Sequence, residues 1–98
     1  MGPISFTTAT DRELMQQIGA GLRAMREAQG LTAIEAAEQT GLARRTVYRA
    51  EHGQNPTLLT IVRLLRLYGR MDALGHFTSA PEISPMALLG QKTGKRRG

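Results

Sequence analysis

The chain has 98 residues and a formal net charge of +5, with no cysteine and no tryptophan. This length allows one small domain with a modest core, and the lack of cysteine excludes disulfides, thiolate metal sites and cysteine nucleophiles. No apolar run approaches the roughly 18 residues that a membrane span needs. The N-terminus lacks the pattern of a signal peptide, so we expect a cytoplasmic protein.

The basic residues divide into two groups. Residues 1–91 hold nine arginines against eight acidic residues, a net charge of only +1. The other basic residues all fall in the last seven positions, as Lys92, Lys95, Arg96 and Arg97. The overall basicity is therefore largely a property of the tail, and a basic helix is better evidence for a nucleic-acid partner than net charge is.

The two ends of the chain differ from its middle. Residues 1–9 are uncharged and include β-branched residues at Ile4, Thr7 and Thr8. A lone strand is not stable, so we expect a flexible N-terminal arm, with pairing to its copy in a dimer as the alternative. Residues 79–98 form a C-terminal extension that ends in a basic tail, which we expect to be disordered on its own.

The first helix is expected to begin at Thr10. Thr10 and Glu13 form a capping box, in which each side chain accepts from the backbone amide of the other residue. Gly19 and Gly21 weaken this helix but would permit close packing, and Gly30 ends it. Apolar residues recur at helical spacing and form one stripe: Leu14, Ile18, Leu22 and Met25.

The second helix is short. Thr32 and Glu35 form a second capping box, which predicts a helix to about Thr40. Gly41 then supplies the positive φ that a tight turn requires. The inner face of this helix is made of small side chains that allow another helix to approach closely: Ala36, Ala37 and Thr40.

The third helix is expected over residues 44–52, with Val47 and Ala50 facing inward and Gly53 as its end. Ala43 occupies the N-cap position and has no side-chain oxygen, which forgoes about 1 kcal/mol of capping.

Two further helices complete the domain. Thr57 caps the fourth helix, which is broken at Gly69, and the fifth helix is expected over residues 71–77. Arginines on one face of the fourth helix are expected to be solvated: Arg63, Arg66 and Arg70. Its core face is expected to consist of Leu58, Ile61, Leu65 and Tyr68, with further apolar surface at Leu59, Val62, Leu64 and Leu67.

The order and spacing of these motifs resemble a known family. Residues 19–77 contain RAMREAQGL at the end of the first helix, T-x-x-E-A-A in the second and G-L at the turn. RTVYRAEHG and NPTLLTIVRLLRLYG follow. The pattern is similar to the lambda-repressor-like (Cro/XRE-type) helix-turn-helix family. The resemblance implies an all-α, compact five-helix DNA-binding bundle over residues 10–78, with flexible termini, that binds palindromic DNA as a homodimer.

The chain also departs from the family pattern. Glutamine is common where this chain has Ala33, so a phosphate contact is in doubt there. A larger apolar residue is usual at Ala36 and Ala50, and Ser or Thr is usual at Ala43. We therefore expect a motif with a smaller core than its relatives have.

The resemblance also assigns site residues. Arg44, Arg45 and Arg49 fall at positions that contact bases or phosphates, and an arginine fork can bond guanine O6 and N7; a solvated arginine face is the alternative. In this family the third helix is the recognition helix, which contacts DNA. Arg26 and Glu51 resemble a pair of family residues that orients this helix and does not itself read DNA. Two further candidate DNA contacts lie on the third helix, Thr46 and Tyr48. Thr32 and Asn55 are candidate phosphate ligands at the edges of the motif.

No constellation of nucleophile, base and oxyanion donor occurs, and His52 and His76 are the only histidines. We therefore expect no enzyme, no metal and no cofactor.

Three functions remain open. The first is a nucleoid-associated transcriptional regulator, a repressor that binds a palindromic operator near its own gene. Its dimer interface would be the surplus apolar surface of helices four and five. The second is an antitoxin, because residues 84–97, SPMALLGQKTGKRR, resemble tails in the HipB-like branch that neutralises HipA-like toxins. The third is an interaction module that binds no DNA.

Overall fold

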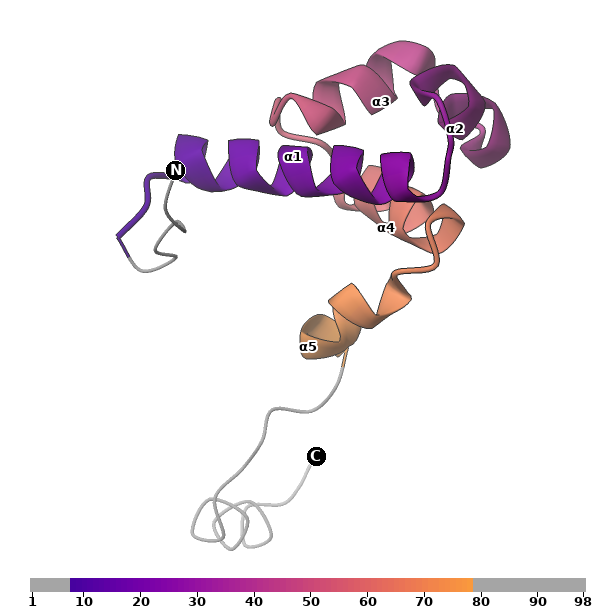
Figure 1. The fold of residues 1–98 in the computed structure, drawn as a ribbon. Helices are drawn as coiled ribbons and strands as arrows, with labels where there is room; N and C mark the ends of the chain where they lie inside the picture. The colour runs from indigo at the N-terminus through magenta and orange to yellow at the C-terminus, as the bar shows by residue number, and fades with distance from the viewer. Residues whose placement is uncertain (1–7, 79–98) are drawn as a thin grey trace, which may run out of the picture.

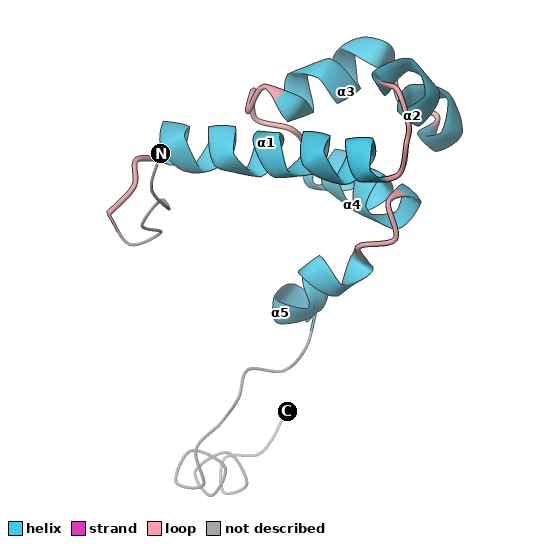
Figure 2. Ribbon diagram, viewed as in Figure 1, coloured by secondary structure: helices cyan, strands magenta, loops and turns pink. Residues whose placement is uncertain are grey.

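The computed structural model describes residues 8–78, and all of their regular structure is helical (Figures 1 and 2). The helices are α1 (Asp11–Ala28), α2 (Ala33–Thr40), α3 (Arg44–Glu51), α4 (Leu58–Leu67) and α5 (Gly75–Thr78), with a 3-10 turn η1 (Met71–Leu74) before the last. The prediction of an all-α, five-helix fold is confirmed. The expected N-terminal arm and basic C-terminal tail lie outside the described residues, and the domain boundaries stay predictions.

Side-chain caps begin three of the helices where the sequence placed them. Thr10–Glu13 and Thr32–Glu35 form the two capping boxes. In each box the threonine hydroxyl accepts from the glutamate amide at 3.1 Å, and the glutamate carboxylate accepts from the threonine amide at 2.8 Å. Thr57 accepts from the amide of Thr60 at 3.1 Å and caps α4. Ala43 makes no side-chain cap at the start of α3. Three helices therefore have locally determined starting points, whereas α3 depends on its packing.

The turn between α2 and α3 is closed by Gly41, whose φ of 77° confirms the expected left-handed conformation. Its amide donates to the carbonyl of Ala37 at 3.0 Å. This conformation strains any residue with a Cβ, so the turn depends on glycine at this position.

The core lies where α1, α2, α3 and α4 meet. α1 runs along the bundle, with α3 on one side of it and α4 on the other (Figure 1). The largest fully buried side chains are Tyr68, Leu64 and Val47. They are joined by small residues that bring the short helices close together, as expected from the sequence: Ala36, Ala37 and Ala50.

The predicted inner face of α4 was partly wrong. Leu58 was expected in the core, but it is 70% exposed as the first residue of α4. The buried face is instead formed by Thr60, Leu64, Leu65 and Tyr68. Apolar residues surround most of α4, so periodicity alone did not single out one stripe; packing against α2 and α3 selected the face that carries Thr60 and Leu64.

The last helix also differs from its prediction. Residues 71–77 were expected to form one short helix, but Met71–Leu74 form a 3-10 turn and Gly75–Thr78 a single α-helical turn. No side-chain cap supports the start of the 3-10 turn at Arg70, and such turns occur in short pieces at helix ends. Among residues 8–78, no helix has the length and apolar character to cross a membrane.

α1 and the end of α3 approach each other backbone to backbone at Gly19. A Cβ at this position would lie 2.6 Å from the carbonyl oxygen of Glu51 and 2.7 Å from that of Ala50. Gly21, which the sequence placed beside it as a second packing glycine, has no neighbouring atom within 4 Å of a Cβ position. Gly19, unlike Gly21, therefore allows the close approach of α1 to the end of α3. Gly53, which follows α3, makes a second such approach, because a Cβ there would lie 2.8 Å from the carbonyl oxygen of Met15.

We expect Gly19→Ala to destabilise the fold by about 1–3 kcal/mol, because the added methyl group overpacks a contact made by backbone. The matched control is Gly21→Ala, which should stabilise the helix by about 0.5–1 kcal/mol, because alanine is the better helix former and has room there. Urea denaturation followed by circular dichroism measures both. Equal stabilities of the two variants would contradict this account of the α1–α3 contact.

Candidate nucleic-acid interface

The recognition helix α3 has one buried side and one cationic side. Val47 and Ala50 are 0% and 1% exposed. Successive residues of an α-helix are rotated by about 100°, which places Arg45 almost directly opposite this buried pair. Arg44, Tyr48 and Arg49 flank it, and all four of these side chains are exposed. The helix therefore presents three guanidinium groups and a phenol ring to solvent.

A shallow depression of about 180 Å³ adjoins this surface between α3 and the start of α4. Asn55 lies in the connecting loop with a φ of 47°, a left-handed conformation that asparagine tolerates better than most residues. The depression brings together three site residues proposed from the sequence: Thr46, Arg49 and Asn55. Four further residues that were not proposed as site residues also line it: Gln54, Pro56, Thr57 and Thr60.

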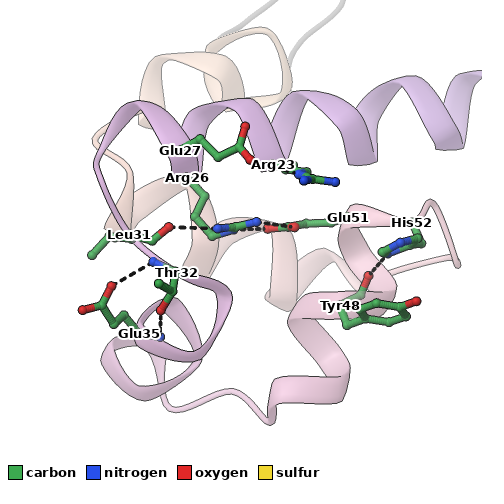
Figure 3. Close-up of polar contacts among 9 residues, drawn as sticks. All are labelled: Arg23, Arg26, Glu27, Leu31, Thr32, Glu35, Tyr48, Glu51 and His52. Atoms are coloured by element: carbon green, nitrogen blue, oxygen red, sulfur yellow. Dashed lines mark hydrogen bonds and ion pairs between the residues drawn. The ribbon is translucent and has the colours of Figure 1, made fainter.

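Tyr48 is held by His52 at the end of the same helix. The two rings stack with centroids 4.0 Å apart and an interplanar angle of 29°. The Nδ1 atom of His52 lies 2.8 Å from the carbonyl oxygen of Tyr48 (Figure 3). Tyr48 remains 57% exposed, so it packs on a neighbour and is still accessible. The i, i+4 spacing of two aromatic rings was the available signal for this stack.

Thr32 lies on a separate element, at the N-terminus of α2. Its hydroxyl and amide both bond to Glu35 in the capping box (Figure 3). The structure thus gives Thr32 a capping role, and the residue is also exposed at the positive end of the helix dipole.

The Arg26–Glu51 ion pair joins α1 to the end of α3. Arg26 Nε donates to Glu51 Oε2 at 2.6 Å and Nη2 donates to Oε1 at 3.0 Å, while Nη1 donates to the carbonyl of Leu31 at 2.8 Å (Figure 3). The two side chains are only 11% and 5% exposed. One guanidinium therefore fixes α1, the end of α3 and the segment that leads into α2.

Two groups at the buried ion pair, Arg26 and the neighbouring Tyr68, have raised pKa values. The hydrogen bond to Glu51 raises the pKa of Arg26, with burial acting in the opposite direction. Burial raises the pKa of Tyr68 to about 12, and the Glu51 charge adds to this effect. Within residues 8–78 the Tyr68 hydroxyl has no hydrogen-bond partner. Arg26 is therefore charged and Tyr68 neutral across the physiological range.

Two arginines of α4 lie apart from the recognition helix. Arg63 and Arg66 are exposed and border a concavity of about 520 Å³ beside the C-terminal end of α2. In the part of the chain that the structure describes, no cluster of three His, Asp or Glu side chains is arranged to hold a metal ion.

The fold and the cationic helix define a DNA-binding protein of the helix-turn-helix class. The helix-turn-helix family model matches residues 22–72, which is 51 of the 98 residues. The chain therefore belongs to the Cro/C1-type helix-turn-helix family, whose members are DNA-binding transcription regulators. No curated protein matches the chain.

We expect Glu51→Ala to destabilise the domain by about 3–5 kcal/mol, because it leaves Arg26 buried without its carboxylate. Glu27→Ala is the control, since Glu27 pairs with Arg23 at 3.1 Å on an exposed surface where both side chains are more than half exposed. It should cost no more than about 0.5 kcal/mol. Chemical denaturation measures both variants, and a cost for Glu51→Ala similar to that of the control would contradict a structural role for the buried pair.

Proposed function

We propose that the protein is a sequence-specific transcriptional repressor that binds a palindromic operator as a homodimer and regulates its own gene. The observation that carries the proposal is the α3 surface, on which three exposed arginines project from a helix fixed to α1 at both Gly19 and Glu51. A rigid helix with free cationic side chains is suited to the major groove. Occupation of the operator by the domain would exclude the polymerase.

The contacts divide by their position on the domain. Arg44, Arg45 and Arg49 are proposed to reach base edges or phosphates, as are Thr46 and Tyr48 at the sides of α3. Two residues at the edges of the motif are proposed to bind phosphates, Thr32 at the N-terminus of α2 and Asn55 in the depression beside Arg49. Amides at helix N-termini favour anions, which supports the position of Thr32.

A dimer is proposed because one short recognition helix reads only a half-site and because the domain exposes a large apolar surface. A groove of about 390 Å³ between α1, α4 and the last two elements is lined by apolar side chains and glycine. Ile18, Leu58 and Phe77 border it and are 49%, 70% and 82% exposed. Apolar patches of this kind mark protein interfaces, and a second copy of the chain is the proposed partner.

An antitoxin is the second candidate function. It rests on the sequence of residues 84–97, which lies outside the described residues. An antitoxin would use the same α3 surface to regulate its operon and the C-terminal extension to bind a HipA-like toxin. A kinase-like toxin gene beside this gene would favour the antitoxin, and its absence would favour the plain repressor.

We expect the double variant Arg44→Ala/Arg45→Ala to weaken operator binding by at least tenfold and to relax sequence preference, because each bidentate base contact contributes about 1–3 kcal/mol. Arg63→Ala/Arg66→Ala removes the same charge from α4 and is the matched control. Fluorescence anisotropy against operator and random DNA measures both. Unchanged affinity of the α3 variant would favour an interaction module that does not bind DNA.

We expect Phe77→Asp to convert the dimer to a monomer, because it places a charge in the apolar groove. Ile34→Asp is the control, since Ile34 is 45% exposed on α2, outside the groove. Sedimentation velocity at micromolar concentration measures the oligomeric state. A Phe77→Asp protein that stays folded and dimeric would show that the second copy binds elsewhere.

A further inference from the structure

We propose that each operator half-site contains closely spaced guanines, with Arg45 bonding one of them through O6 and N7 at the centre of the interface. The inference rests on the proposed function, because it names the DNA sequence that the α3 surface recognises. It concerns which bases are read, whereas the proposed function concerns whether a preferred operator exists.

The chemistry of the exposed side of α3 limits what it can read. Its outward side chains are Arg44, Arg45, Tyr48 and Arg49, and the guanidinium groups only donate hydrogen bonds. The one carboxylate of the helix, Glu51, is engaged by two donors of Arg26. Cytosine presents a donor to the major groove and requires an acceptor such as a carboxylate. α3 therefore has no free carboxylate with which to select cytosine on the contacted strand.

Adenine is disfavoured for a related reason. It presents an acceptor and a donor side by side, which asparagine and glutamine match with one amide group. α3 contains neither residue, and the nearest amides, Gln54 and Asn55, follow the helix in the loop beside the depression. Guanine presents two adjacent acceptors, N7 and O6, which is the pattern that an arginine fork satisfies. Three donor forks on one helix thus favour guanine, which offers two adjacent acceptors, over cytosine and adenine.

The rotation of α3 distinguishes the arginines. Arg45 points away from the buried Val47 and Ala50, so it extends furthest from the domain. Arg49 is one turn later on the side that borders the depression. Four residues rise about 6 Å along a helix, and bases in one DNA strand are stacked about 3.4 Å apart. Arg45 and Arg49 therefore span about two base-pair steps, which predicts guanines within about two positions of each other.

The test begins with selection of binding sites from random duplex DNA by the full chain. Each guanine of the selected half-site is then replaced singly by 7-deazaguanine, which lacks the N7 acceptor but pairs normally. Affinities are measured for the wild-type chain, Arg45→Lys and Arg63→Lys. Arg45→Lys keeps the charge and loses the fork, and Arg63→Lys is the control on an exposed arginine of α4.

We expect 7-deazaguanine at one central position to weaken wild-type binding, but by less than the roughly 5- to 150-fold of a whole bidentate contact, because the O6 acceptor remains. The same substitution should have a smaller effect on Arg45→Lys, because the planar fork is lost and the lysine ammonium makes a less directional contact with guanine. Arg63→Lys should respond to 7-deazaguanine as the wild type does.

Three results would contradict the inference. A selected half-site without two guanines within about two positions of each other would overturn it and leave the proposed function intact. Equal 7-deazaguanine effects in wild type and Arg45→Lys would show that Arg45 does not read guanine. Unchanged operator affinity of Arg45→Lys would indicate a phosphate contact only. Failure of the proposed function is distinct from all of these, since it would appear as no enrichment of any sequence from the random pool.

Discussion

The position of the recognition helix depends on the contact between α1 and the end of α3. This contact combines the buried Arg26–Glu51 pair with the absence of a side chain at Gly19, where the carbonyls of Ala50 and Glu51 approach α1. Burying two charges is costly, and such pairs often add little net stability. We infer that this pair contributes orientation: the two parallel hydrogen bonds of a guanidinium fork permit one relative placement of the helices.

The short helices have little stability of their own. α2 and α3 contain eight residues each, fewer than an isolated helix needs in water. Their packing therefore has to be close, and alanines at the contact allow it: Ala36, Ala37 and Ala50 are almost completely buried. Two of these alanines, Ala36 and Ala50, stand where the family resemblance led us to expect larger apolar residues. The small core is thus compatible with a precise arrangement, because interaxial separation depends on the side chains at the contact.

The start of α3 is unfavourable for a helix and favourable for an anion. Ala43 provides no cap, no acidic residue lies in the first turn, and Arg44 and Arg45 place positive charge at the positive end of the dipole. Tertiary packing of Val47 and Ala50 offsets these local costs. A polyanion at this end would relieve the repulsion, so the feature that weakens the free helix would contribute to binding. Natural sequences break local rules most often at functional sites.

Local features of this protein followed from its sequence alone, because they depend on residues three or four positions apart. The threonine caps at Thr10, Thr32 and Thr57 and the left-handed turn at Gly41 were all predicted in place. The cationic side of α3 also follows from helical periodicity.

Tertiary structure decided the remaining features. Leu64 is buried in the core, whereas Leu58 is exposed. Gly19, and not Gly21, packs against a neighbouring helix, and Asn55 lies in a depression that forms only in the folded domain. The Arg26–Glu51 pair spans 25 positions, and only the family resemblance suggested it. Contacts between distant residues depend on how whole helices fit together, and periodicity within one helix does not contain that information.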